Sequence, residues 1–324
     1  MAKENMMETT QITDMDAFAS AIKQRMEQTH PSANVEIREV PQNNSLALTG
    51  ITVYEKGRNI APTIYLEDFF EAYQAGKLLD EISRIIEEIN RRATPDTNFD
   101  LSGIMAFSAV KEKICYKLVN AAKNAAQLKE MPHRLWQDLA IIYYVPVSIE
   151  TVADVSTITV NNSMMELWGV DEDTLYRQAH RNTPKLFKAE ITPIIDVLKN
   201  MLRETESPEA EMIAGMLEAE LDAEFPEGAP QLYAATNDRQ MNGAAVLLYD
   251  GILERFARQT GCDFYILPSS IHETLFLPAA PDSDRYGIPE MVRGINAGCL
   301  APEEVLSDNA YLYHAGDGSV TLLS

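Results

Sequence analysis

Four polar residues that could do chemistry lie close together near residue 270. Ser269, Ser270, His272 and Glu273 supply two hydroxyls, an imidazole and a carboxylate. Nucleophilic and general acid–base catalysis require these groups. In an extended strand, however, His272 and Glu273 would point to opposite faces and could not reach one ligand unless the strand starts later. The segment therefore has two interpretations, a polar turn, which we favour, and a catalytic site.

The elements expected around these residues decide what they could bind. Residues 244–249 and 264–267 are apolar, and residues 250–260 between them have helical spacing, which predicts strand, helix, strand with a right-handed parallel crossover. In open sheets ligands bind beyond the carboxyl ends of strands, so the turn at residues 268–270 is well placed. The candidate surface comprises Arg239, Asn242, Gly243, Ser269, Ser270, His272 and Glu273.

A second, weaker cluster precedes a buried strand expected at residues 139–147. It contains Pro132, His133, Arg134, Trp136 and Asp138. A turn from a helix into the strand explains the same residues without any chemistry.

Known catalytic and nucleotide motifs are incomplete or absent. His272-Glu273 begins like a zinc-protease helix, but Phe276 stands where the second His is required. Residues 108–111 and 307–309 match two of the three elements of serine penicillin-recognising enzymes, but Lys-Thr-Gly is missing, so we interpret both matches as coincidence. No phosphate-binding loop, dinucleotide turn or nucleophile elbow occurs, and we expect neither a metal nor a cofactor.

The first half of the chain mixes helical and alternating patterns. Helical spacing predicts helices near residues 14–30, 65–73, 78–89 and 121–129, and alternation predicts a hairpin of residues 35–40 with 45–54. Short apolar runs predict strands at residues 114–118 and 139–147. The pattern loosens near residues 150–156, where we place a boundary between an α+β half, residues 1–150, and a mixed α/β half, residues 151–324.

The second half has clear helix signals and a closing hairpin. Asp171 is the expected N-cap of a helix that Pro184 stops, and residues 204–224 predict an exposed acidic helix or an insertion. The strand-helix-strand unit at residues 244–267 continues with a strand at 272–277, which completes a strand-helix-strand-strand unit. Residues 311–313 and 320–323 predict a C-terminal hairpin, and the whole chain predicts a mixed α+β fold of two packed halves.

The amino-acid composition indicates the cellular compartment of the protein and the classes of partner that it can bind. The chain has 324 residues and a formal net charge of -22, which disfavours direct nucleic-acid binding. No apolar run is long enough to span a bilayer, and the first ten residues lack the apolar stretch of a secretory signal. Three widely spaced cysteines argue against a disulfide framework. We therefore expect a cytoplasmic protein.

Four segments are distinctive in combination: TIYLEDFFEAYQAG (residues 63–76), NGAAVLLY (242–249), ILPSSIHE (266–273) and APEEVLSD (301–308). Together they resemble an uncharacterised bacterial family, a domain of unknown function found in gut anaerobes. The resemblance runs over nearly the whole chain and implies a relative without an established activity.

Three functions remain open from the sequence. We favour a non-enzymatic binding or regulatory accessory factor whose partner is another protein. The alternatives are a hydrolase or transferase that uses Ser270 or His272 with Glu273, and an acidic mimic of nucleic acid that occupies a basic protein.

Overall fold

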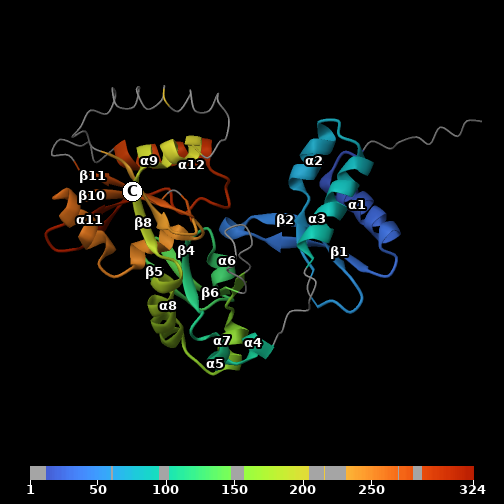
Figure 1. Ribbon diagram of the computed structural model, residues 1–324, viewed down its shortest axis with the longest axis horizontal. Coiled ribbons are helices and arrows are strands. Elements are labelled where there is room, and N and C mark those ends of the chain that lie inside the picture. Colours follow the sequence, from blue (N-terminus) through green and yellow to red (C-terminus); the bar gives the residue numbers. More distant parts are fainter. Residues whose placement is uncertain are drawn as a thin grey trace, which may run out of the picture. The chain divides into compact units, whose positions relative to one another are not determined.

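The computed structural model describes residues 12–59, 61–94, 102–146, 157–203, 215, 231–268, 270–279 and 287–324. The chain divides into two compact units, the first formed by residues 1–42 and 46–101, the second by residues 43–45 and 102–324. The boundary expected at residues 150–156 and most of the acidic segment 204–224 lie outside the described residues. Figure 1 labels the helices and strands.

Unit 1 is a three-stranded antiparallel sheet with helices packed on one face. Asp14 caps the first helix as expected, because its side chain accepts a hydrogen bond from Ala17 N at 2.8 Å. The predicted hairpin is confirmed, and Val35 lies opposite Val53 on the face that the helices cover. The elements are α1 (Met15–Thr29), β1 (Asn34–Pro41), β2 (Ala47–Tyr54), β3 (Thr63–Tyr65), α2 (Glu67–Gln74) and α3 (Leu79–Ala93), with strand order β1-β2-β3.

Unit 2 contains two further antiparallel sheets. One has the order β4-β6-β5 with β7 paired to β6, and the other has the order β13-β12-β10-β11-β9-β8. The first group of elements is α4 (Ser102–Met105), α5 (Phe107–Val110), β4 (Cys115–Asn120), α6 (Ala125–Leu128), β5 (His133–Trp136), β6 (Leu139–Pro146), β7 (Thr157–Thr159), α7 (Asn162–Trp168) and α8 (Glu172–Leu186). The second is β8 (Ala189–Pro193), α9 (Ile194–Arg203), β9 (Tyr233–Asn237), η3 (Gly243–Leu248), α11 (Ile252–Thr260), β10 (Phe264–Leu267), β11 (Thr274–Pro278), α12 (Gly287–Cys299), β12 (Ala310–Tyr313) and β13 (Val320–Leu323).

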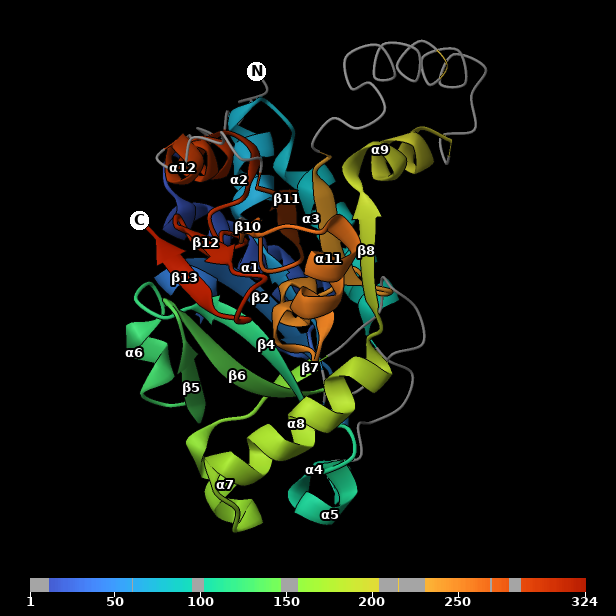
Figure 2. The ribbon, with the colours of Figure 1, turned by 90° about the vertical axis from the view of Figure 1, so that its left-hand side faces the viewer.

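Helices cover both faces of the six-stranded sheet, as Figure 2 shows from another side. On one face, Phe256 of α11 packs against Phe264 and Phe276, with ring centroids 4.8 and 5.0 Å apart. On the other, Val292 of α12 joins Tyr265 and Leu312 in a separate apolar cluster. Alternation along the strands thus produces two cores, as a two-residue period requires.

Several predicted elements are confirmed within unit 2. The mixed α+β fold class, the buried strand β6 and the C-terminal hairpin β12–β13 all form. Asp171 caps α8 by accepting a hydrogen bond from Thr174 N at 2.9 Å. The helix runs two residues beyond Pro184 before it ends at Leu186. The helix expected at residues 121–129 is shorter and comprises Ala125–Leu128.

The strand expected at residues 244–249 is wrong, and with it the parallel crossover. These residues form the 3-10 helix η3, whose residues 243–247 are buried. Because these residues are buried on all sides, their sequence lacks the alternation of polar and apolar residues that would distinguish a short strand from a helical turn. Every strand pair in the described chain is antiparallel. The N-cap of helix α11 is Gly251, with φ 72.

Candidate functional site

The candidate surface is centred on a turn between β10 and β11. Ser270 forms an isolated β-bridge with Val305, and Ile271 N donates to Glu304 O at 2.8 Å. Strand β11 begins at Thr274, later than predicted. His272 and Glu273 therefore lie in the turn and not in the strand. Ser269 lies outside the described residues.

The side chains of Ser270 and His272 bind backbone groups. Ser270 Oγ accepts a hydrogen bond from His272 N at 3.0 Å. His272 Nδ1 accepts one from Asn242 N at 3.4 Å, which assigns the proton of a neutral imidazole to Nε2. Nε2 lies 4.0 Å from Oε1 of Glu304, and both side chains are about 40% exposed, at 39% and 41%. Sequence spacing gave no signal for Glu304.

Asn242 and Gly243 bring η3 close to this turn. Asn242 has a left-handed backbone, φ 50, and is 9% exposed. A Cβ at Gly243 would lie 2.1 Å from Thr236 Oγ1 and 2.2 Å from His272 O, so only glycine fits there. Thr236 Oγ1 donates to the same His272 carbonyl at 2.8 Å. Three segments therefore meet at the backbone of one turn residue.

Arg239 and Glu273 complete the candidate surface but are not joined to its hydrogen bonds. Arg239 N donates to Asn237 Oδ1 at 3.0 Å, and among the described residues its guanidinium forms no ion pair. Burial raises the pKa of the Glu273 carboxyl, and the neighbouring His272 opposes that shift.

This arrangement differs from that of a catalytic nucleophile and its base. Such a pair requires a hydrogen bond between the two reacting side chains, with a third group that orients the base. Ser270 and His272 instead hold backbone N–H groups. The geometry produces a firmly held polar surface with an exposed imidazole.

The second cluster separates into two structural networks. Arg134 pairs with Glu172 at 2.8 Å and with Asp173, and its guanidinium lies 4.1 Å from the centre of the Tyr176 ring. Tyr143 also donates to Glu172. The expected helix-to-strand turn is wrong for this stretch, because residues 133–136 form the edge strand β5.

Asp138 forms the other network with a segment far away in the sequence. Its carboxylate accepts hydrogen bonds from Ser307 Oγ at 2.6 Å, Asn309 Nδ2 at 2.9 Å and Tyr311 OH at 2.5 Å. Ser307 and Tyr311 are fully buried. Asp138 is thus the structural partner of the Ser-Asp-Asn motif at residues 307–309. Local sequence spacing could not predict this contact, because Ser307 and Asp138 are 169 residues apart.

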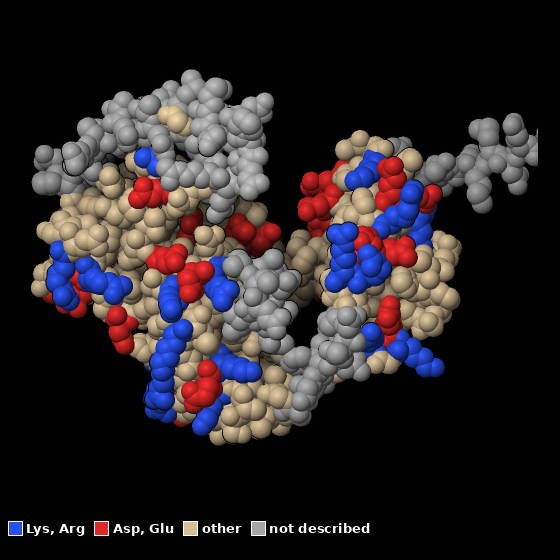
Figure 3. Space-filling model, in the orientation of Figure 1, with Lys and Arg blue, Asp and Glu red and all other residues tan. Residues whose placement is uncertain are grey.

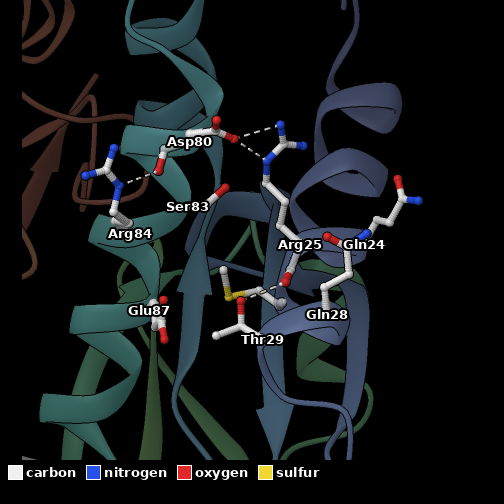
Figure 4. Close-up of a pocket in the computed structure, with 9 residues that line it drawn as sticks. Gln24, Arg25, Gln28, Thr29, Asp80, Ser83, Arg84 and Glu87 are labelled. Atoms are coloured by element: carbon white, nitrogen blue, oxygen red, sulfur yellow. Dashed lines mark hydrogen bonds and ion pairs between the residues drawn. The ribbon is translucent and has the colours of Figure 1, made fainter.

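Sequence reasoning missed a polar groove in unit 1. The groove has a volume of about 450 Å³ and lies between α1 and α3 (Figure 4). Arg25 of α1 pairs with Asp80 of α3 at 2.9 Å, and Arg84 Nε donates to the Asp80 carbonyl at 3.2 Å. The sequence signals only that these helix positions face water. A further pocket of about 420 Å³ lies at the β12–β13 turn, beside Asp263 and His314.

Within the described ranges, no group of three or more His, Cys, Asp or Glu side chains could hold a metal ion. None of the described helices is long and apolar enough to cross a membrane.

Comparison with known proteins identifies the family. The model of a family of unknown function, DUF5688, matches residues 15–315. The chain belongs to this family. No curated protein and no solved structure matches it. The resemblance noted in the sequence is therefore confirmed as membership of a family of unknown function, and membership assigns no activity.

Proposed function

We propose that this DUF5688 protein is a non-enzymatic binding or regulatory factor and that another protein binds its candidate surface. The described part of that surface comprises Arg239, Asn242, Gly243, Ser270, His272 and Glu273. We also place the protein in the cytoplasm, because Cys115, Cys262 and Cys299 are free thiols, as a reducing compartment favours.

The proposal rests on one observation: side chains of the candidate surface hold the backbone of its turn in place. Ser270 and His272 each accept a backbone hydrogen bond, and Gly243 packs directly against the same turn. A turn fixed in this way presents its exposed groups in one geometry, which reduces the ordering entropy of association.

A hydrolase or transferase remains the second candidate, and one observation favours it. Burial raises the pKa of Glu273, and perturbed carboxyl groups are frequent at catalytic sites. The missing hydrogen bond between Ser270 and His272 weighs against this alternative.

The nucleic-acid mimic has less support. On the face drawn in Figure 3, basic side chains lie among the acidic ones of the described residues. A mimic of nucleic acid needs a surface with a uniformly negative electrostatic potential. Ion pairs such as those of Arg91 and Arg92 with Glu88 reduce that potential.

Replacing His272 with Ala separates a structural histidine from a catalytic one. We expect His272→Ala to lower the free energy of unfolding by about 1–2 kcal/mol, because Asn242 N loses its acceptor. Urea unfolding measures the loss, and the exposed His133→Ala is the matched control. A variant with wild-type stability that loses turnover of a co-purified ligand would support the enzyme instead.

The protein-binding proposal needs its own test. A partner captured from the native host is purified, and its Kd is measured with the wild type, Arg239→Glu and Arg181→Glu. Arg181 is an exposed residue of α8, so it matches the charge change away from the candidate surface. We expect Arg239→Glu to change the Kd about tenfold and Arg181→Glu to leave it unchanged. Equal affinities of both variants would contradict binding at this surface.

A further inference from the structure

Strand β1 gives unit 1 a long free sheet edge. Its eight residues, Asn34–Pro41, make it the longest edge strand in the described chain. On one side β1 pairs with β2, and on the other side its backbone has no hydrogen-bond partner among the described residues. Such an edge is a template for another strand.

The side chains of β1 alternate between two faces. Val35 and Ile37 face the helix-covered core. Glu36 and Arg38 lie on the opposite face, where they form an ion pair within the strand. Their side chains are 30% and 63% exposed, so both are available to a neighbouring strand.

The order Glu36-Ile37-Arg38 is self-complementary about its central residue. When two copies of β1 pair antiparallel about a two-fold axis at Ile37, Glu36 of each copy lies opposite Arg38 of the other. Opposite charges at directly facing positions stabilise a strand pair. Axes at Glu36 or at Arg38 would instead place two like charges opposite each other, so among these three central registers the charges favour the axis at Ile37.

The same register suits the rest of the strand. It pairs residues 34–40 of one copy with residues 40–34 of the other, so Pro41, which has no N–H to donate, lies just outside. The two Ile37 side chains meet on the axis, on the face that carries the apolar core. In this register Glu39 of each copy lies opposite Val35 of the other, so the favourable side-chain contacts are the two Glu36–Arg38 pairs and the central Ile37 pair.

We propose that two copies of the chain dimerise by antiparallel pairing of β1 about Ile37. The two three-stranded sheets then form one continuous sheet of six strands. This inference goes beyond the proposed function, because it concerns unit 1 and does not involve the candidate surface.

The test begins with the mass of the full chain in solution over a range of concentrations. A chain of 36.2 kDa should sediment at twice that mass, with dissociation on dilution. Arg38→Glu places two like-charged pairs across the axis, and we expect it to weaken the dimer about 30-fold or more. Lys77→Glu, an exposed reversal in the same unit but outside β1, should leave the dimer unchanged.

Complementary variants make the test specific to the register. Glu36→Arg alone should dimerise at least about 30-fold more weakly than the wild type, as should Arg38→Glu alone, because each variant places like charges opposite each other across the axis. Mixed in equal amounts they should form a heterodimer, and the double swap Glu36→Arg/Arg38→Glu should dimerise like the wild type. Circular dichroism checks that every variant is folded.

Three results would overturn the proposal. They are a wild type that stays monomeric at all concentrations, a dimer that neither charge reversal weakens, and single variants that fail to combine on mixing. A wild type that stays monomeric while its β1 edge binds a different protein is a case of the first result.

Discussion

At Asp138, three side chains from a distant segment donate hydrogen bonds to one carboxylate, whereas at the turn of residues 270–273 the side chains of Ser270 and His272 accept hydrogen bonds from backbone N–H groups. Ser307 and Asp138 are 169 residues apart in the chain. Ser270 bonds to the backbone of His272, two residues away, and His272 bonds to the backbone of Asn242, 30 residues away. Both regions carry the residue types of a catalytic site, and in both the hydrogen bonds between described residues hold the fold together.

The difference concerns what each network holds together. The Asp138 carboxylate joins the β5–β6 turn to the start of β12, and Asn120 of β4 adds a hydrogen bond to Leu306 O at 3.0 Å. Buried donors that lose such an acceptor have no water to replace it. In the turn at residues 270–273 Ser270 is buried but His272 and Glu273 are half-buried, so solvent reaches more of this turn than of Ser307 and Tyr311. Disruption should therefore be more costly at Asp138.

The largest effect is expected for Asp138→Ala. It leaves the hydroxyls of Ser307 and Tyr311 buried without an acceptor, which should lower the free energy of unfolding by about 3 kcal/mol. Urea unfolding followed by tryptophan fluorescence measures it, because both tryptophans, Trp136 and Trp168, lie in unit 2. Trp136 packs against Tyr311 with ring centroids 5.3 Å apart.

Asp250→Ala is the matched control for that substitution. Asp250 is also an aspartate of unit 2, but its side chain is 89% exposed and contacts only His180 among the described ion pairs. We expect a change within about 0.5 kcal/mol. Equal losses in the two variants would show that the Asp138 network does not join the sheets energetically.

Local signals allowed much of the fold to be predicted. The cap at Asp171, the hairpin of β1 with β2 and the strand β6 each depend on residues that are neighbours in sequence. The strand predicted at residues 244–249 was wrong because an apolar run of that length is compatible both with a strand and with a buried helical turn. The parallel crossover failed for the same reason, since it required that strand.

The candidate site was harder to predict than the elements around it. Ser270 and His272 were named from their chemistry and Asn242 from its place before a predicted strand, and the structure joins the three. Their hydrogen bonds run through backbone groups, which sequence composition does not report. Glu304 near His272 and Ser307 at Asp138 belong to a segment whose position depends on the whole sheet order. No spacing rule reaches over such distances.

Two buried tyrosines test the contribution of the Asp138 network, with a smaller expected change in the free energy of unfolding. Tyr311 and Tyr116 are both fully buried, but Tyr311 OH donates to Asp138, whereas Tyr116 OH has no hydrogen-bond partner among the described residues. We expect Tyr311→Phe to lower the free energy of unfolding by about 1–2 kcal/mol and Tyr116→Phe to leave it unchanged or raise it. Equal losses would mean that ring packing, and not the Asp138 hydrogen bond, sets the stability.

The smallest effect belongs to the turn and depends on pH. Burial raises the pKa of Glu273 above its ordinary value of 4.5, so the unfolded chain releases this proton at a lower pH than the folded chain. The carboxyl therefore destabilises the fold at neutral pH, and this penalty disappears as the pH falls through the folded pKa towards 4.5. Glu273→Gln should raise stability at pH 7 by less than Tyr311→Phe lowers it, and the gain should vanish in acid. Urea unfolding of both proteins between pH 4 and pH 7 measures the difference. A gain that is independent of pH would mean that the raised pKa is not its cause, and a loss at pH 7 would mean that the Glu273 carboxylate binds a group that stabilises the turn.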